Sequence, residues 1–287
     1  MSSAKLVEYL PAKLEARSFS PARANVLGVG VHALDLLQAA GTIEAAIIAG
    51  RKGYVCVTGV HGVMEAQRSP EFRSILNRAF LVTPDGMPTV WVGKLQGHYY
   101  MRRVFGPDLM LEVCRRSPAR GYTHFLYGGK PGVAEQLRGV LAQAFPGIEV
   151  VGTYVPPFRD LSCAEEASLI RQVSLSKPDI IWVGLSTPRQ ERFMWKYLHR
   201  LNSTLMIGVG AAFDIHTGRI KDAPSWIKLS GLQWLHRLCQ EPSRLWKRYL
   251  INNCGFVAKL ALQLFRLKNY ELDPTLEYDE EVPDVNS

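Results

Sequence analysis

Short runs of apolar residues recur along the chain, and between them apolar residues follow a helical spacing. Near-continuous apolar strands separated by helices are typical of a parallel sheet covered on both faces. The pattern therefore predicts an α/β fold, with a doubly wound, mainly parallel Rossmann-like sheet, from about residue 20 to residue 225. The predicted strands are NVLGVGV (25–31), YVCVTGV (54–60), AFLVTP (79–84), THFLYGG (123–129), EVVGTYV (149–155), DIIWVGL (179–185) and TLMIGVGAAF (204–213).

The turn after the predicted strand 123–129 is a candidate phosphate-binding site. Gly128 and Gly129 lie at its carboxyl end, and residues 131–145 follow with helical spacing after Pro131. Open α/β sheets bind ligands at such strand ends, where the N–H groups of a helix N-terminus favour phosphate. GGKPG matches neither a P-loop nor G-x-G-x-x-G, so an ordinary turn between strand and helix remains the alternative.

From Trp226 the chain changes character. Residues 226–268 are helical in pattern, rich in Trp and Leu, and contain eight Lys or Arg residues against one acid, Glu241. Arg237, Arg244 and Arg248 would share one face of a continuous helix, but Pro242 predicts that a new helix begins there. Two interpretations stay open: an interfacial membrane helix, or helices that pack on the core with their charges solvated.

Three segments follow from these patterns: a Rossmann-like core (1–225), a basic amphipathic appendage (226–270) and a disordered acidic tail (271–287). The formal net charge is +8, and the seven acids of the tail leave +15 on residues 1–270. Such an excess favours an anionic partner. The five cysteines show no C-x-x-C spacing, and there is neither a signal peptide pattern nor an apolar run of spanning length, so we expect a cytoplasmic protein.

Asp85 is the strongest candidate for acid–base chemistry. It lies in TPDGMP, directly after a predicted strand. Pro, Asp and Gly are ordinary turn residues, but a carboxylate at a strand's carboxyl end is also well placed to accept a proton from a sugar hydroxyl. The chain has no D-x-D and no H-x-x-x-H pair, so a departing diphosphate would be stabilised by Arg, Lys and helix dipoles rather than a metal.

Two further polar positions follow predicted strands. His61 comes after TGV and could reach a ligand, although a lone histidine at a strand end is more often structural. Gln190, in STPRQER, could contact a ligand together with Arg189 or Arg192. Ser186 and Thr187 before Pro188 also fit an ordinary helix N-cap.

Taken together, the chain resembles the WecG/TagA/CpsF family of glycosyltransferases, which transfer a sugar from UDP to a lipid-linked acceptor in bacterial surface polysaccharide synthesis. The resemblance runs from about Val26 to Val257 in ordered blocks: TGVHGVMEAQRSPEF, TPDGMPTVWVGKLQG, RRVFGPDLM, FLYGGKPGVAEQL, PDIIWVGLSTPRQERFM and GVGAAFDIHTGRIKDAPSWIKLSGLQWLHRLCQEPSRLWKRYL. It implies an inverting, metal-independent enzyme at a membrane surface.

The resemblance also implies roles for single residues. Asp85 matches the catalytic aspartate, and Thr58 and Gln190 match pocket residues, with His61, Gly128 and Gly129 as further donor contacts. The diphosphate arginines of the family's C-terminal appendage match the residues Arg237, Arg244 and either Lys247 or Arg248. Val60 stands where many relatives have Asn, so the donor sugar stays open.

The expected partners are a UDP-sugar, a polyprenyl-diphosphate-linked acceptor and the inner face of the cytoplasmic membrane. No cofactor and no nucleic acid are expected, and a homo-oligomer is left open. Two other functions remain as alternatives. The basic charge would suit a non-catalytic nucleotide- or nucleic-acid-binding protein, although no nucleic-acid motif is present. GVGVHA (28–33) approaches the glycine fingerprint of a Rossmann oxidoreductase.

Overall fold

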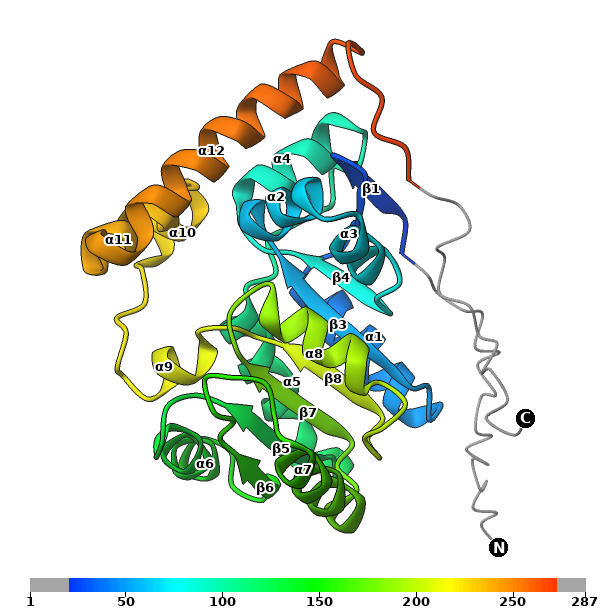
Figure 1. Ribbon diagram of the computed structural model, residues 1–287, viewed down its shortest axis with the longest axis vertical. Helices are drawn as coiled ribbons and strands as arrows, with labels where there is room; N and C mark the ends of the chain where they lie inside the picture. The colour runs from blue at the N-terminus through cyan, green and yellow to red at the C-terminus, as the bar shows by residue number, and fades with distance from the viewer. Residues whose placement is uncertain (1–20, 273–287) are drawn as a thin grey trace, which may run out of the picture.

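The centre of the molecule is a six-stranded parallel sheet of order β4-β3-β8-β7-β5-β6 (Figure 1). This computed structural model describes residues 21–272, apart from the side chains of Ser225, Leu229 and Arg244; most of the predicted acidic tail lies outside the described residues. The predicted α/β fold is confirmed. The strands are β3 (Gly53–Thr58), β4 (Leu81–Pro84), β5 (Thr123–Gly128), β6 (Glu149–Tyr154), β7 (Ile180–Gly184) and β8 (Leu205–Gly208).

Helices cover both faces of the sheet, because its central strands are apolar on both sides. One buried cluster joins the sheet to α2 (Val60–Arg68), α3 (Pro70–Asn77), α7 (Cys163–Ser176) and α8 (Arg189–Tyr197). The other joins it to α1 (Leu36–Ile48), α5 (Gly106–Arg120), α6 (Val133–Ala144) and α9 (Ala212–His216). Side-chain caps begin several of these helices, such as the capping boxes of Asp35 in α1 and Ser162 in α7.

Residues 25–31 do not form a strand of the main sheet, so that prediction was wrong. They form most of an antiparallel hairpin of β1 (Arg23–Val26) and β2 (Val29–His32), which turns at Leu27 and Gly28 with positive φ. The hairpin packs beside β4, where the Val82 N–H donates to His32 Nδ1 at 2.9 Å. GVGVHA therefore lies in a hairpin and its exit, not at a turn between strand and helix, which removes the motif that suggested an oxidoreductase.

The strand order places a crevice at the carboxyl ends of β3 and β8, which are neighbours in the sheet. The chain leaves β3 into α2 on one face and leaves β8 towards α9 on the other. Diverging connections of this kind open a ligand site above the strand ends.

The C-terminal segment consists of three helices: α10 (Ser225–Leu229), α11 (Gln233–Gln240) and α12 (Pro242–Leu264). The break before Pro242 is as predicted. Helix α12 packs across α2, where Phe256 is buried and a β-carbon on Gly255 would lie 2.9 Å from Met64 Cε. Figure 1 shows α10–α12, in yellow and orange, on the same side of the molecule as α2 and α4 (Met87–Leu95). Within residues 21–272, the described helices include none with the length and apolar character to cross a membrane.

Candidate active site

A cavity of about 890 Å³ lies between the carboxyl ends of the sheet strands and the C-terminal helices. Its floor consists of the turns that follow β3, β4, β5, β7 and β8. The other side consists of residues 228–260 from α10, α11 and α12. Residues separated by almost the whole chain thus enclose one space, at the point where the strand order predicts a ligand site.

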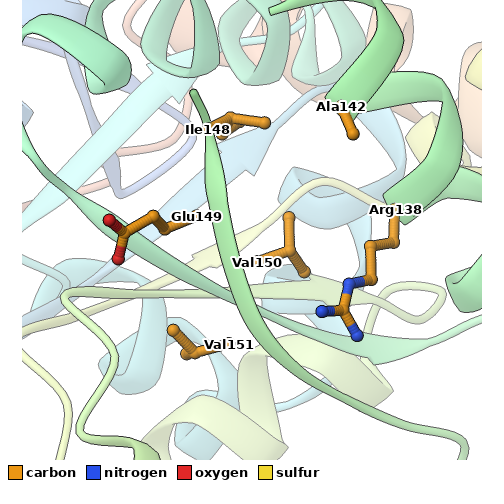
Figure 2. A pocket seen from close by; sticks show the side chains of 6 residues that line it. All are labelled: Arg138, Ala142, Ile148, Glu149, Val150 and Val151. Atoms are coloured by element: carbon orange, nitrogen blue, oxygen red, sulfur yellow. The ribbon is translucent and has the colours of Figure 1, made fainter. Parts of the chain in front are cut away.

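A second hollow, of about 410 Å³, lies at the far edge of the sheet (Figure 2). It is lined by residues of β6 and α6 together with Ile148, and its charged groups are Arg138 and Glu149. Both are exposed, and neither lies at a strand's carboxyl end. This hollow lacks the converging polar groups of the larger cavity, so we take the larger cavity as the candidate site.

Asp85 lies on the floor of the larger cavity, directly after β4. Its backbone N–H donates to the Thr58 carbonyl oxygen at 2.9 Å, which joins the turns that follow β3 and β4. Gly59 allows this close approach, because a β-carbon there would collide with the Asp85 carbonyl oxygen. The Asp85 side chain keeps 34% of its surface exposed. Its carboxylate is therefore closely surrounded by protein but open to the cavity.

Arg103 forms an ion pair with Asp85. Its Nη2 lies 3.6 Å from Asp85 Oδ1 and also donates to Gln233 Oε1 on α11. The guanidinium stacks on the Phe105 ring, 4.3 Å from its centroid. Burial raises the pKa of Asp85 above its usual range, against the opposing effect of Arg103. A raised pKa makes the ionised carboxylate a stronger proton acceptor near neutral pH.

Positive charge predominates in the cavity lining. Among the described side chains, six Lys or Arg residues line it, against the two carboxylates of Asp85 and Asp214, so the site favours an anionic ligand. The cations are Arg103, Lys130, Arg189, Lys228, Arg237 and Arg248.

The expected diphosphate residues divide between the cavity and the surface. Arg237 lines the cavity and forms an ion pair with Glu241 at 3.2 Å. Arg248 also lines it, with its Nε buried and without a hydrogen-bond partner within the described part of the chain. Lys247 instead lies outside the lining, on the exposed face of α12 beside the Trp246 ring. Arg244 lies on α12, but its side chain is not among those that the structure describes.

Two predicted donor contacts are not part of the cavity lining. Thr58 is only 2% exposed, and its Oγ1 has no hydrogen-bond partner among the residues described. Gly128 packs against β7, where a β-carbon would lie 2.6 Å from the Gly184 carbonyl oxygen. Its neighbour Gly129 does line the cavity, together with Lys130. The close packing of two strands gives position 128 a structural reason to be glycine, and its contact with a donor stays a prediction.

Gln190 and His61 both line the cavity, yet their polar atoms bind to other parts of the protein. The Gln190 amide accepts from the Gly210 N–H at 3.0 Å and donates to Glu191 at 3.1 Å. The two ring nitrogens of His61 lie 2.9 Å from Asn252 Nδ2 and 3.3 Å from the Thr187 carbonyl oxygen. Direct contact of these two side chains with a donor stays a prediction.

Several cavity residues had no role in the sequence-based prediction, among them Arg103, Lys228, Gln233 and Asn252. Arg103 lies in an irregular segment between α4 and α5, where no periodic pattern indicates which side chains point inward. The other three are polar positions in helices. Only the packing of those helices over the strand ends makes them part of the site.

The donor set for a metal is limited. Between residues 21 and 272, no group of three or more His, Cys, Asp or Glu side chains is arranged to hold a metal ion.

The sequence matches known glycosyltransferases over most of its length. The model of the Glycosyl transferase WecG/TagA/CpsF family matches residues 24–270. An N-acetylglucosaminyldiphosphoundecaprenol N-acetyl-beta-D-mannosaminyltransferase of Bacillus spizizenii is 30% identical over 209 residues, 72% of this chain and 79% of that protein. A protein of the same name from Bacillus subtilis is 29% identical over 185 residues, 64% of this chain and 70% of that protein.

Proposed function

Because the chain belongs to the WecG/TagA/CpsF family of glycosyltransferases, we propose that it transfers a sugar from a UDP-sugar to a polyprenyl-diphosphate-linked glycan in bacterial surface polysaccharide synthesis. The names of both Bacillus relatives specify a diphosphoundecaprenol-linked acceptor. The predominance of cations in the cavity supports an acceptor and a donor that each contain a diphosphate.

The proposed reaction is a single displacement in which Asp85 is the general base. The carboxylate takes the proton of the acceptor hydroxyl while that oxygen attacks the anomeric carbon of the donor. The bond from that carbon to the diphosphate oxygen breaks, UDP leaves with the electron pair, and the anomeric configuration inverts. A carboxylate with a raised pKa, on the floor of a basic cavity, is the observation that carries this proposal.

The cations of the C-terminal helices would stabilise the departing diphosphate. Arg237 and Arg248 line the cavity from α11 and α12, and Lys228 does so from α10. A well-placed donor to developing negative charge contributes roughly 3 kcal/mol in comparable sites. We propose that these side chains act without a metal, so transfer should be insensitive to EDTA.

The same helices also offer a surface for a membrane. Trp226 and Trp246 are exposed, and Lys247 lies beside Trp246. Aromatic side chains flanked by cations are typical of a helix that lies at an anionic lipid surface. We therefore propose peripheral association with the inner face of the cytoplasmic membrane, where the acceptor lipid would be reached.

The Asp85→Asn variant tests the base directly. It keeps the shape of the side chain but cannot accept the proton, so transfer should fall by about 100-fold to 10,000-fold while UDP affinity stays nearly unchanged. The measurements are product formation with a short-chain lipid-diphosphate-sugar acceptor and UDP binding by calorimetry.

Asp160→Asn is the control. Asp160 is exposed, does not line the cavity and is not among the charges that shift the pKa of Asp85, so its substitution should leave transfer largely intact. Near-normal transfer by Asp85→Asn would remove Asp85 from the role of base.

A further inference from the structure

A chain of hydrogen bonds begins on the C-terminal helix and ends in the wall of the cavity. Asn252 on α12 is 3% exposed, and its Oδ1 accepts from Arg68 Nη2 of α2 at 2.6 Å. Its Nδ2 lies 2.9 Å from His61 Nδ1. Because the amide nitrogen can only donate, His61 Nδ1 accepts, and the ring proton lies on Nε2. That proton is donated to the Thr187 carbonyl oxygen at 3.3 Å.

The chain continues beyond Thr187 through buried groups. The Thr187 hydroxyl donates to Glu191 Oε1 at 2.7 Å, and the Gln190 amide donates to the same oxygen at 3.1 Å. The Gln190 oxygen in turn accepts from the Gly210 N–H, after β8. Asn252 is thus connected to two of the turns that form the cavity floor.

The position of Asn252 on α12 gives this connection a consequence for the ligand. Arg248 lies four residues earlier, so both side chains point from the same face of the helix. Both also line the cavity. Whatever holds Asn252 against His61 therefore also holds the α12 backbone at Arg248, from which the guanidinium extends, relative to the floor.

We propose that Asn252 and His61 are positioning residues, which set α12 and its Arg248 in register with the turn between β7 and α8. This proposal rests on the proposed function, because transfer is one of its readouts. Neither residue needs to touch the reacting atoms. Their part is to join the two sides of the cavity through a neutral imidazole that accepts on one side and donates on the other.

A carboxylate at position 252 tests the connection through His61. In an Asn252→Asp variant both partners of the ring, the carboxylate and the Thr187 carbonyl oxygen, are acceptors, and neutral His61 has one N–H to donate, so one of the two bonds is lost in either tautomer. Protonation of His61 would give Nδ1 a proton and restore the connection as a charge-assisted bond. The variant should therefore regain activity as the pH falls.

The direction of that pH dependence follows from the groups around His61. They are Glu65 and Arg68 on α2, Arg248 and Asn252 on α12, and the Thr187 carbonyl oxygen. In the wild-type protein, burial first and Arg248 next lower the pKa of His61, against Glu65, whose Oε1 lies 3.8 Å from Nδ1. The imidazole is thus neutral at pH 7. A carboxylate at position 252 would raise the pKa, so the connection would form below the raised pKa and be lost above it.

The experiment compares kcat/KM for four proteins from about pH 5 to about pH 8, the range in which histidine titrates. They are the wild type, Asn252→Asp, Asn252→Leu and Cys254→Asp. Cys254 is an exposed α12 residue outside the cavity lining, so its variant adds the same charge without entering the chain of bonds. Dividing the kcat/KM of each variant by that of the wild type at the same pH removes the effect of Asp85 titration.

Near pH 8, Asn252→Asp should lose about tenfold or more in kcat/KM, as expected for a broken buried hydrogen bond of about 1.5 kcal/mol. Its ratio to the wild type should rise as the pH falls, whereas Asn252→Leu stays low throughout and Cys254→Asp stays near one. The positioning role would be overturned if the kcat/KM ratio to the wild type were the same for Asn252→Asp and Asn252→Leu and did not change with pH. This holds whether the two ratios are near one or reduced.

A second measurement needs no substrate. Asn252→Leu should accelerate amide hydrogen exchange in the first turn of α8, at Arg189 and Gln190, whose N–H groups bond to the Ser186 carbonyl oxygen. Unchanged exchange there would overturn the coupling. If the wild-type protein transfers no sugar, the proposed function fails, and the exchange result still decides the coupling.

Discussion

Arg103 links Asp85, the proposed base, to Gln233 of α11. Its Nη2 is shared between Asp85 and Gln233, while its Nε is buried and has no hydrogen-bond partner within residues 21–272. A buried N–H without a partner is costly. The same positive charge opposes the rise in the pKa of Asp85.

We therefore expect Arg103→Gln to alter the pH dependence as well as the rate. Without the guanidinium the pKa of Asp85 rises further, so the loss of kcat/KM on acidification begins at a higher pH. The maximal rate should also fall about tenfold or more, since a hydrogen bond from a charged donor contributes about 1.5–3 kcal/mol. The measurement is the acid limb of the profile of kcat/KM against pH.

Arg102→Gln is the control for that change. Arg102 is exposed and bonds to the Tyr99 carbonyl oxygen, outside the cavity lining. Its variant should keep the wild-type acid limb. An unshifted limb in Arg103→Gln would mean that Arg103 does not act on the base.

The sequence predicts a functional role for an individual residue only where the neighbouring residues indicate one. Asp85 stands out because an acid in a Pro-Asp-Gly turn directly follows an apolar strand. Lys247 and Arg248 are adjacent cations on one helix, and no local pattern says which one faces the cavity. That depends on how α12 packs on α2, through Phe256 and Gly255.

At the scale of elements, apolar runs located the strands well and misassigned one segment. NVLGVGV was predicted as one strand because its apolar residues are nearly continuous, whereas the chain reverses at Leu27 and Gly28. The turn residue Asn25, whose Oδ1 accepts from the Gly28 N–H at 2.8 Å, lies inside the apolar run, where a single polar residue is easily read as part of one strand. The parallel strands β3, β7 and β8 gave the same kind of signal and were predicted as strands, although the predicted run 204–213 extends five residues past the end of β8 and into α9.

The turn between α10 and α11 fixes the C-terminal helices against α4. Gly231 has φ +79°, and a β-carbon there would lie 2.9 Å from the Trp91 ring. Gly231→Ala should strain the backbone by roughly 1–3 kcal/mol and push the turn away from α4. We expect transfer to fall about tenfold or more, while the core keeps its melting temperature within a few degrees.

Gly218→Ala provides a matched comparison. Gly218 has a similar φ of +73°, but no atom lies within 4 Å of the β-carbon it would gain. The Gly218→Ala variant should have the same backbone strain but should not displace the turn between α10 and α11. If both variants lose transfer equally, backbone strain and not contact with Trp91 is responsible.

At the scale of the whole molecule, the C-terminal helices have one face towards the cavity and another towards solvent. Neighbouring residues on α12 separate these faces, with Lys247 exposed and Arg248 lining the cavity. The basic and aromatic composition of the segment predicted both a membrane contact and a diphosphate contact. The structure assigns different residues to the two faces, because a helix turns its neighbouring side chains about 100° apart.

This division predicts opposite effects for two neighbouring substitutions. Lys247→Glu should weaken binding to vesicles that contain anionic lipid by about tenfold or more, since each basic residue near the surface contributes about 1 kcal/mol. It should leave transfer to a water-soluble acceptor unchanged. Arg248→Gln should lose that transfer while largely keeping vesicle binding.

The measurements are vesicle co-sedimentation at low and high salt, and the rate with a soluble acceptor. Binding should weaken as salt increases, because the attraction is electrostatic. If Lys247→Glu lost transfer to the water-soluble acceptor, the assignment of Lys247 to the solvent face and of Arg248 to the cavity face would be contradicted.

The enclosure of the cavity by residues far apart in the chain has a consequence for synthesis. The strand-end turns are all complete once β8 and the segment after it have left the ribosome, whereas α11 and α12 emerge later. Because domains generally fold from the N-terminus during translation, the sheet can form before Arg237 and Arg248 emerge. A nascent chain can therefore hold Asp85 in place before Arg237 and Arg248 join the cavity, and the proposed reaction would begin only after these later helices have packed.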